Sequence, residues 1–150
     1  MIEIKNRKAY YNYEIIETIE AGLVLNGTEI KSIKKGMVNI SDSYAIISNK
    51  EAFLLNMHIA HYEKGNRFNH EESRTRKLLL NKNEILKLEE KVKIMGYSLI
   101  PVKLYFKKNK VKILIGIGKG KKLHDKREAI KKEEMNKEAK SQMKKAVREY

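Results

Sequence analysis

The alternation of hydrophobic and polar residues begins at residue 13 and predicts several short strands. Residues 13–19 place Ile15 and Ile19 on one side of a strand and Glu14 and Ile16 on the other. After Glu20 the alternation resumes around Leu23 and Leu25, which suits a strand that is buried on at least one face. Residues 1–9 contain no comparable run, so we expect them to form a flexible lead-in.

The segment 26–36 predicts a short basic helix directly after this strand. Asn26-Gly27 ends the strand, and Thr28 is the expected N-cap of the helix. Ile30 and Ile33 form its inner face, and Gly36 ends it in the left-handed conformation. Three lysines are then left facing water, namely Lys31, Lys34 and Lys35.

Two hairpins and a second helix follow. Residues 44–48 and 52–56 are apolar runs that flank a short polar turn, and residues 98–106 and 111–117 repeat this pattern. Between them lie a polar loop at 60–75, an extended segment at 76–80 and a helix that Asn81 and Glu84 cap and Gly96 ends. Pro101 cannot donate to a ladder, so it belongs at an edge or a bulge.

About six short antiparallel strands with short flanking helices predict a mainly β fold. A small closed OB-like β-barrel fits this count and leaves no free sheet edge. The periodicity alone allows an open α+β sheet almost equally well. We expect residues 1–118 to form the barrel.

Residues 119–150 differ in character, and we call them the tail. They carry many Lys, Glu and Ala residues but only a thin apolar stripe, which predicts a helix without enough surface to dock on the barrel. We therefore expect the tail to be disordered when the protein is free and helical when it is bound.

Charge indicates the partner. The 150 residues carry 33 Lys and Arg against 19 Asp and Glu, for a net charge of +14, which attracts polyanions. A membrane surface is the less favoured alternative because no basic helix has a strongly apolar face with Trp or Phe. The chain has no cysteine, no signal-peptide pattern and no apolar run long enough to span a bilayer, so we expect a cytoplasmic protein without disulfides.

Several motifs in sequence order resemble one family. They are Asn6-Arg7-Lys8-Ala9, residues 20–36, Ser41-Asp42-Ser43-Tyr44, residues 74–80, Leu104-Tyr105-Phe106, residues 118–122 and Asp125-Lys126-Arg127. Together they span essentially the whole chain and are similar to the SsrA-binding protein (SmpB) family, the partners of bacterial transfer-messenger RNA (tmRNA). The resemblance implies an OB-like barrel and a non-enzymatic adaptor for trans-translation, without cofactor or metal. One copy would bind the tRNA-like domain of each tmRNA, replace its missing anticodon arm and accompany it into a stalled 70S ribosome.

The resemblance also implies two groups of site residues. Those for tmRNA are Asn6, Arg7, Lys8, Tyr11, Glu20, Lys31, Lys34, Arg74, Arg76, Lys77 and Leu79. In the ribosome, the tail would meet small-subunit rRNA in the decoding centre and the empty mRNA channel. The site residues for these ribosome contacts are Lys119, Lys121, Lys122, His124, Asp125, Lys126 and Arg127. Tyr11 stands where the family commonly has histidine.

Glu20 and Leu79 have plainer interpretations from the residues alone. A glutamate on a strand is ordinarily solvated, whereas the family uses this one to contact RNA, where a carboxylate accepts from exocyclic amino groups of bases. Leu79 alternates with Leu78 and Leu80, so it is either core or an exposed platform for a base. The resemblance favours the platform.

Two rival functions remain. Composition alone suits a ribosomal protein or a generic OB-fold RNA binder. His70-Glu71-Glu72 suggests acid–base chemistry, and His58 with His61 suggests a metal, but three-residue spacing at a strand end would put these two histidines on opposite faces. We therefore expect neither catalytic nor metal-binding residues.

Overall fold

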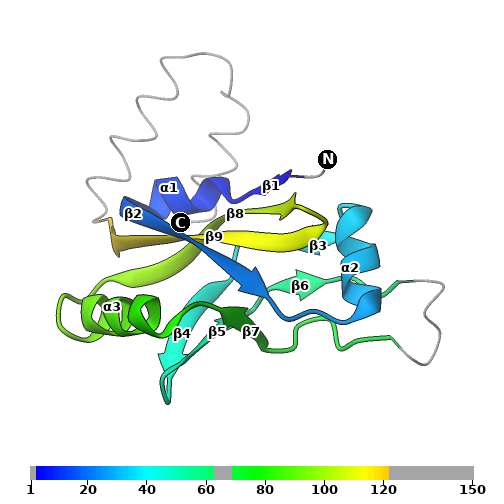
Figure 1. Ribbon diagram of the computed structural model, residues 1–150. Coiled ribbons are helices and arrows are strands. Elements are labelled where there is room, and N and C mark those ends of the chain that lie inside the picture. Colours follow the sequence, from blue (N-terminus) through cyan, green and yellow to red (C-terminus); the bar gives the residue numbers. More distant parts are fainter. Residues whose placement is uncertain (1–2, 63–68, 122–150) are drawn as a thin grey trace, which may run out of the picture.

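The computed structural model describes residues 3–62 and 69–121, which form nine strands and three helices (Figure 1). The strands are β1 (Glu3–Lys5), β2 (Tyr13–Leu23), β3 (Val38–Asn39), β4 (Tyr44–Ser48), β5 (Glu51–Leu55), β6 (His58–Ile59), β7 (Arg76–Leu79), β8 (Ser98–Lys107) and β9 (Lys110–Gly120). The helices are α1 (Arg7–Asn12), α2 (Gly27–Lys34) and α3 (Lys82–Lys93).

Six antiparallel strands close into a ring, which confirms the predicted barrel. The sheet order is β1-β8-β4-β5-β7-β2-β9, and a further pairing of β8 with β9 closes it. β1 adds to the free part of the β8 edge at Lys103–Tyr105, and β4 pairs with the same edge only at Leu99. The remaining strands, β3 and β6, form a small separate ladder.

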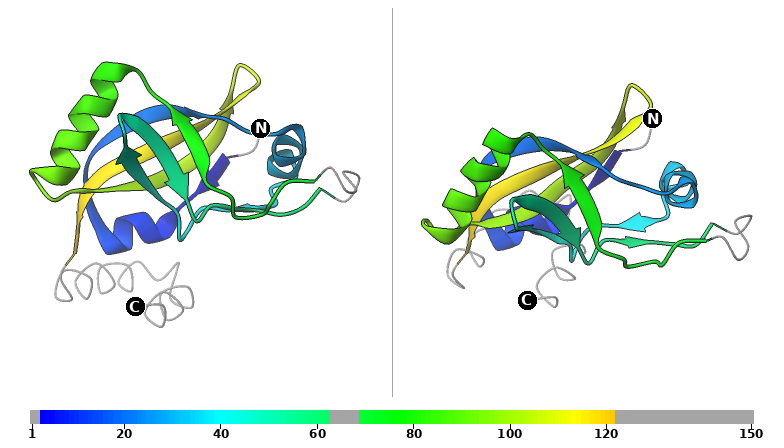
Figure 2. Two further views of the ribbon diagram at one scale, coloured as in Figure 1. Left: turned by 90° about the horizontal axis from the view of Figure 1, so that it is seen from below. Right: turned by 60° about the horizontal axis from the view of Figure 1, so that its bottom comes forward.

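The core fills the barrel with residues that alternate inward along the strands. Leu54, Leu104, Ile113 and Ile115 are all at most 1% exposed. α3 adds Leu88 to this core, and α2 adds Ile33. Figure 2 shows α3 and α2 on opposite sides of the barrel.

Several local predictions are confirmed. Asn81 Oδ1 accepts from the N–H of Glu84, and the N–H of Asn81 donates to Glu84 Oε1, so the capping box of α3 is complete. Gly36 and Gly96 have positive φ just beyond α2 and α3. The register of β8 against β9 shifts between Pro101 and Lys103, which places the proline at a bulge.

Other predictions are wrong. Residues 1–9 were expected to be a flexible lead-in, but residues 3–5 form β1, and α1 begins at Arg7. Asn26 caps α2 in place of Thr28, because the N–H of Asn26 donates to Glu29 Oε1 in the first turn. β2 is a single strand of 11 residues, so Glu20 lies inside it.

The last strand of the barrel runs past residue 118. β9 continues to Gly120 and pairs there with Tyr13, and the N–H of Lys121 donates to Asn12 O at 2.8 Å. β9 therefore extends two residues beyond 118, and Lys121 follows it directly with one backbone hydrogen bond. Within the described residues, no helix is long and apolar enough to cross a membrane.

Candidate nucleic-acid interface

A row of four residues crosses the outer face of the barrel. Tyr105 on β8 pairs with Lys112 on β9, Lys112 pairs with Gly22 on β2, and Gly22 pairs with Leu79 on β7. Residues that are paired across strands point to the same side of a sheet, so the row forms one continuous surface. Glu20 lies on the same face of β2, two residues before Gly22. The row of four residues and Glu20 together are called the β2 surface.

Leu79 is the apolar part of the β2 surface. Its side chain is 53% exposed, whereas its neighbour Leu78 is buried, so the alternation along β7 places Leu79 outside the core. A methyl group on Gly22 would lie 3.2 Å from Leu79 Cβ and 3.6 Å from Lys112 Nζ. Gly22 therefore lets Leu79 lie close over β2, toward the ammonium group of Lys112.

Glu20 is the acidic part of this surface. The hydroxyl of Tyr105 donates to Glu20 Oε2, and Lys107 Nζ lies 3.5 Å from Oε1. The hydrogen bond from Tyr105 is the main cause that lowers the pKa of Glu20, so the carboxylate is ionised at neutral pH. Burial and this carboxylate together raise the pKa of Tyr105 to about 12, so its hydroxyl keeps its proton and acts as the donor.

This carboxylate can accept a further hydrogen bond. A carboxylate has about four lone-pair positions, and here Tyr105 and Lys107 use one on each oxygen. The fixed orientation suits an amino group of an unpaired base, while the nearby lysines suit phosphates.

The lysines of α2 lie at one end of the barrel. Lys31 and Lys34 are exposed, as expected. Lys31 Nζ lies 5.4 Å from the ring centroid of Tyr62, and Nζ of Lys35, the residue directly after α2, lies 5.0 Å from it, so both ammonium groups face an aromatic ring. Lys77 is exposed on β7 and has an ion pair of 3.8 Å with Glu51.

Arg76 corrects the expected set of phosphate contacts, because its side chain is fully buried. Its Nε donates to Glu29 Oε2 at 2.6 Å, and its other nitrogens donate to backbone carbonyls, including Met57 O at 2.6 Å and Glu72 O at 3.1 Å. The guanidinium therefore holds α2, β7 and the chain near residue 72 together.

Glu29 is the buried partner in this pair. Burial alone would raise the pKa of Glu29, but hydrogen bonds from Arg74, from the N–H of Asn26 and from Arg76 outweigh it and lower the pKa. Arg74 approaches the same carboxylate at 2.5 Å and is 26% exposed, so it joins the buried pair to the surface.

Asn6 is a second correction. It is 2% exposed, and its Nδ2 donates to Pro101 O at 2.8 Å and to Ile40 O at 3.3 Å. This side chain fixes the start of α1 to β8 and to the chain before β4, and it is not on the surface.

The structure separates the other N-terminal candidates from Leu79 and groups them with the first residues of the tail. Arg7, Lys8 and Tyr11 lie on α1, which packs through Ala9 on Ile100 and Val102 of β8. Lys121 Nζ donates to Tyr10 O at 2.8 Å, and Lys119 Nζ lies 5.2 Å from the ring centroid of Tyr97. The expected tail contacts of Lys122, His124, Asp125, Lys126 and Arg127 lie outside the described residues.

The three histidines in the described part of the chain, His58, His61 and His70, have structural partners. Both His58 and His61 approach Glu72, at 3.0 and 3.5 Å, so the expectation of opposite faces is wrong because β6 ends at Ile59. His70 is buried between Thr28 Oγ1 and Ile59 O, at 2.9 and 2.8 Å. In the described part of the chain, no group of three or more His, Cys, Asp or Glu residues could hold a metal ion.

Sequence reasoning found Glu20 and Leu79 but missed three members of the β2 surface: Gly22, Tyr105 and Lys112. Tyr105 had a detectable signal, since it alternates with the buried Leu104 in a motif that resembles the family. Gly22 and Lys112 had no such signal in the sequence, because their position on this surface depends on how β2 pairs with β7 and β9.

Comparison with known proteins gives consistent matches. The model of the family described as SmpB protein matches residues 3–145. An SsrA-binding protein of Staphylococcus haemolyticus is 56% identical over 134 residues, which cover 89% of this chain and 86% of that protein. An SsrA-binding protein of Staphylococcus saprophyticus is 54% identical over 140 residues, which cover 93% of this chain and 91% of that protein.

A solved structure is also similar. It is described as tmRNA-SmpB in the bacterial ribosome, and the matching chain is 43% identical, with a TM-score of 0.69. The match covers 85% of this chain and 94% of the other.

Proposed function

This chain belongs to the SmpB family, the SsrA-binding proteins, and we propose that it is the adaptor that binds tmRNA and brings it to stalled ribosomes in trans-translation. Family membership over most of the chain carries this proposal. The similarity to a tmRNA-SmpB structure in the ribosome supports both partners, tmRNA and the 70S ribosome. The protein would then act in the cytoplasm, where ribosomes work.

The β2 surface is our candidate for the contact with the tRNA-like domain. A base that leaves its stack can pack on Leu79 while its amino group donates to Glu20. Lys107 lies 3.5 Å from Glu20, Lys112 pairs with Gly22, and Lys77 stands two residues before Leu79 on β7. We assign these lysines, together with the exposed Lys34 of α2, to phosphates. Arg76 and Asn6 hold the scaffold from inside.

The barrel would occupy the place of the missing anticodon arm, with one copy for each tmRNA. The tail, beginning at Lys119 and Lys121, would enter the decoding centre and the empty mRNA channel. There we assign Lys122, Lys126 and Arg127 to phosphates, His124 to a ribosomal base and Asp125 to the cap of a helix that forms on binding. The protein would supply binding surfaces only, and the ribosome and a synthetase would supply the chemistry.

Selective RNA binding tests the first part of the proposal. The protein should bind the tRNA-like domain of tmRNA more tightly than bulk tRNA, and Leu79→Ala should weaken that binding. Leu86→Ala is the matched control, because Leu86 on α3 is 44% exposed and lies outside the β2 surface. Equal affinity for both RNAs would favour a generic OB-fold RNA binder.

Truncation tests the second part. A chain that ends at Lys121 keeps β9 and its contact with Asn12, so it should still bind the tRNA-like domain. The same chain should fail to support peptide tagging on ribosomes stalled on a truncated mRNA. Full tagging by the truncated chain would refute the role proposed for the tail.

A further inference from the structure

The turn that joins β2 to α2 has no role in the function proposed above. It contains Asn26-Gly27, the only Asn-Gly step in the sequence, and both residues are exposed. In such a step the backbone nitrogen of glycine can attack Cγ of the asparagine side chain, because glycine has no Cβ to hinder the approach. The step is therefore a candidate for deamidation, the loss of the side-chain amide nitrogen.

Gly27 is open to solvent. A Cβ built on Gly27 would have no heavy atom within 4 Å. Gly27 is also the first residue of α2, so its N–H has no acceptor within the helix. The attacking nitrogen is therefore neither covered by packing nor held by the helix.

The two ends of this turn are anchored to the barrel. The N–H of Val24 donates to Lys77 O at 3.0 Å, and Thr28 Oγ1 lies 2.9 Å from His70 Nδ1. The side chain of Asn26 belongs to the capping box of α2, so it must leave the first turn before it reacts. Helix ends fray readily, so this opening does not require the barrel to unfold.

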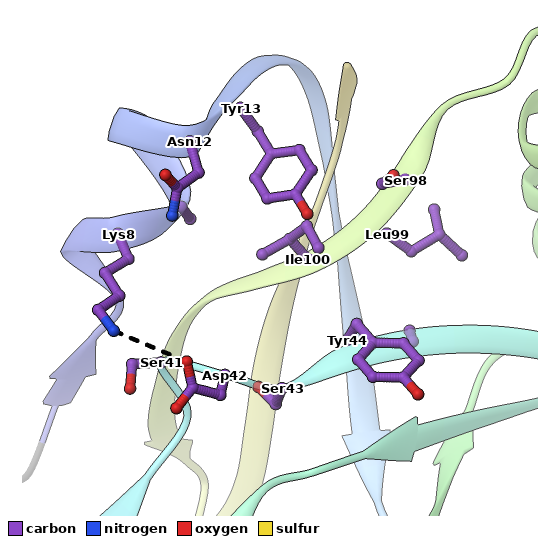
Figure 3. A pocket seen from close by; sticks show the side chains of 12 residues that line it. Lys8, Asn12, Tyr13, Ser41, Asp42, Ser43, Tyr44, Ser98, Leu99 and Ile100 are labelled. Atoms are coloured by element: carbon purple, nitrogen blue, oxygen red, sulfur yellow. Dashed lines mark ion pairs between the residues drawn. The ribbon is translucent and has the colours of Figure 1, made fainter. Parts of the chain in front are cut away.

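Two other asparagines at helix ends differ in the residue that follows them. Asn81 caps α3 as Asn26 caps α2, but Lys82 follows it. Asn12 is the last residue of α1, its Oδ1 is buried, and Tyr13 follows it. Figure 3 shows Asn12 and the ring of Tyr13 beside each other on the rim of a pocket. A side chain at the following position hinders the attack at both sites.

We propose that Asn26-Gly27 is a modification site at which Asn26 deamidates in the folded protein. The Gly27 nitrogen loses its proton to solvent hydroxide and bonds to Asn26 Cγ, and the C–N bond of the side-chain amide breaks as ammonia leaves. Water then opens the cyclic imide at either carbonyl, which gives aspartate or isoaspartate. The net reaction consumes one water and releases one ammonia, without oxidation or reduction.

The two products affect α2 differently. Both lower the net charge of +14 by one unit. Aspartate is as good an N-cap as asparagine, and its charge suits the positive end of the helix dipole. Isoaspartate routes the chain through the side-chain carbon, which lengthens the backbone and disrupts the capping box. Isoaspartate should therefore lower Tm by roughly 4 °C.

The new carboxylate would also lie close to Arg74. Arg74 Nη2 donates to Val24 O at 3.2 Å and to Glu29 Oε1 at 2.5 Å, and the N–H of Asn26 donates to the same glutamate oxygen. A carboxylate at position 26 offers Arg74 an acidic partner in place of RNA, a consequence that rests on the proposed function. Affinity for the tRNA-like domain should fall roughly two- to fivefold, the effect of one exposed charge.

The chemical test incubates the full chain at mildly alkaline pH and follows Asn26 by peptide mapping with mass spectrometry. Isoaspartyl methyltransferase with labelled S-adenosylmethionine detects isoaspartate. Both products should form at Asn26 well before any forms at Asn81. Gly27→Ala is the matched control, because the structure leaves room for the methyl group and alanine favours a helix more than glycine does. This variant should lose most of the conversion.

The binding test compares forms of the same protein. Cation exchange separates the incubated protein into an unchanged form and a more acidic form, and each is titrated with the tRNA-like domain. The acidic form should bind more weakly, whereas Gly27→Ala incubated in parallel should keep its affinity. Thermal melting of each sample checks that the barrel is intact.

Two results would overturn the proposal. Conversion of Asn26 no faster than that of Asn81, or equally fast in Gly27→Ala, would refute the modification site. Equal affinity of the two separated forms would refute the effect on RNA binding. Failure of the fresh wild-type protein to bind the tRNA-like domain would instead refute the proposed function, and the peptide map would still decide the chemistry at Asn26.

Discussion

Replacing Arg76 with methionine should lower the stability of the barrel and leave the salt dependence of RNA binding unchanged. Methionine keeps the apolar stem but removes every hydrogen bond that the guanidinium makes to Glu29, Met57 O and Glu72 O. Arg76 and Glu29 are both fully buried, so no water can replace these bonds without opening the structure.

The expected loss follows from this burial. Breaking a buried ion pair by removing one partner costs about 3–5 kcal/mol, because the remaining charge is left without compensation. Arg74 and the N–H of Asn26 still contact Glu29, so we expect the lower half of that range. For a barrel of this size, about 3 kcal/mol lowers Tm by roughly 10 °C.

Lys77→Met provides the control, since Lys77 is the next residue in β7 but is exposed. It should leave Tm within a few degrees and reduce the slope of log K against log salt by about one unit if Lys77 contacts one phosphate. Thermal melting by circular dichroism and RNA titration at three salt concentrations measure both quantities. If Arg76→Met retains the wild-type Tm and instead reduces the slope, then the buried role of Arg76 is refuted.

Three further predictions concern other parts of the barrel. In Gly22→Ala, the new Cβ would lie 3.2 Å from Leu79 Cβ and should push Leu79 away from Lys112. Binding to the tRNA-like domain should weaken about tenfold with little change in Tm, and unchanged affinity would contradict the role of Leu79. A chain that ends at Gly118 loses the pairs of β9 with Tyr13 and Glu14, so it should melt several degrees below a chain that ends at Lys121, and equal Tm values would place the boundary at 118. Lys87 and Lys91 lower the pKa of Glu17 from its ordinary value of 4.5 to about 2, so this carboxylate stabilises the fold above pH 4.5 and loses that contribution as the pH falls toward 2. Glu17→Gln should therefore flatten the decrease in Tm over this range, with an effect below about 1 kcal/mol because the carboxylate is partly exposed. An unaltered pH profile of Tm would contradict the ion pairs.

The fold was largely predictable because its signals are local. Asn81 with Glu84 marked the start of α3, and Pro101 marked a bulge in β8. The N-terminal segment was missed because β1 has only three residues and α1 only six, and both are stabilised by distant partners on β8 rather than by their own pattern.

The site was predictable only in part, for a related reason. Exposure of Leu79 followed from alternation once the phase of β7 was known, and the resemblance supplied that phase. The burial of Arg76 could not be predicted from the same alternation, because a buried arginine requires Glu29, which lies 47 residues earlier in the chain. Family motifs mark positions that matter, but they do not distinguish a contact with RNA from a contact within the protein.

The position of Glu20 explains why a protein with a net charge of +14 keeps a carboxylate on its candidate RNA surface. Glu20 repels phosphates, whereas Lys107 and Lys112 beside it attract them, so a bound strand would be positioned with its backbone on the lysines and a base toward the carboxylate. Tyr105 supports this arrangement, since its hydroxyl donates to Glu20, lowers the pKa of that carboxylate and restricts its orientation. Tyr105→Phe should therefore reduce discrimination between tmRNA and bulk tRNA more than it reduces total affinity, because it loosens the carboxylate that we propose selects a base and leaves every cation in place.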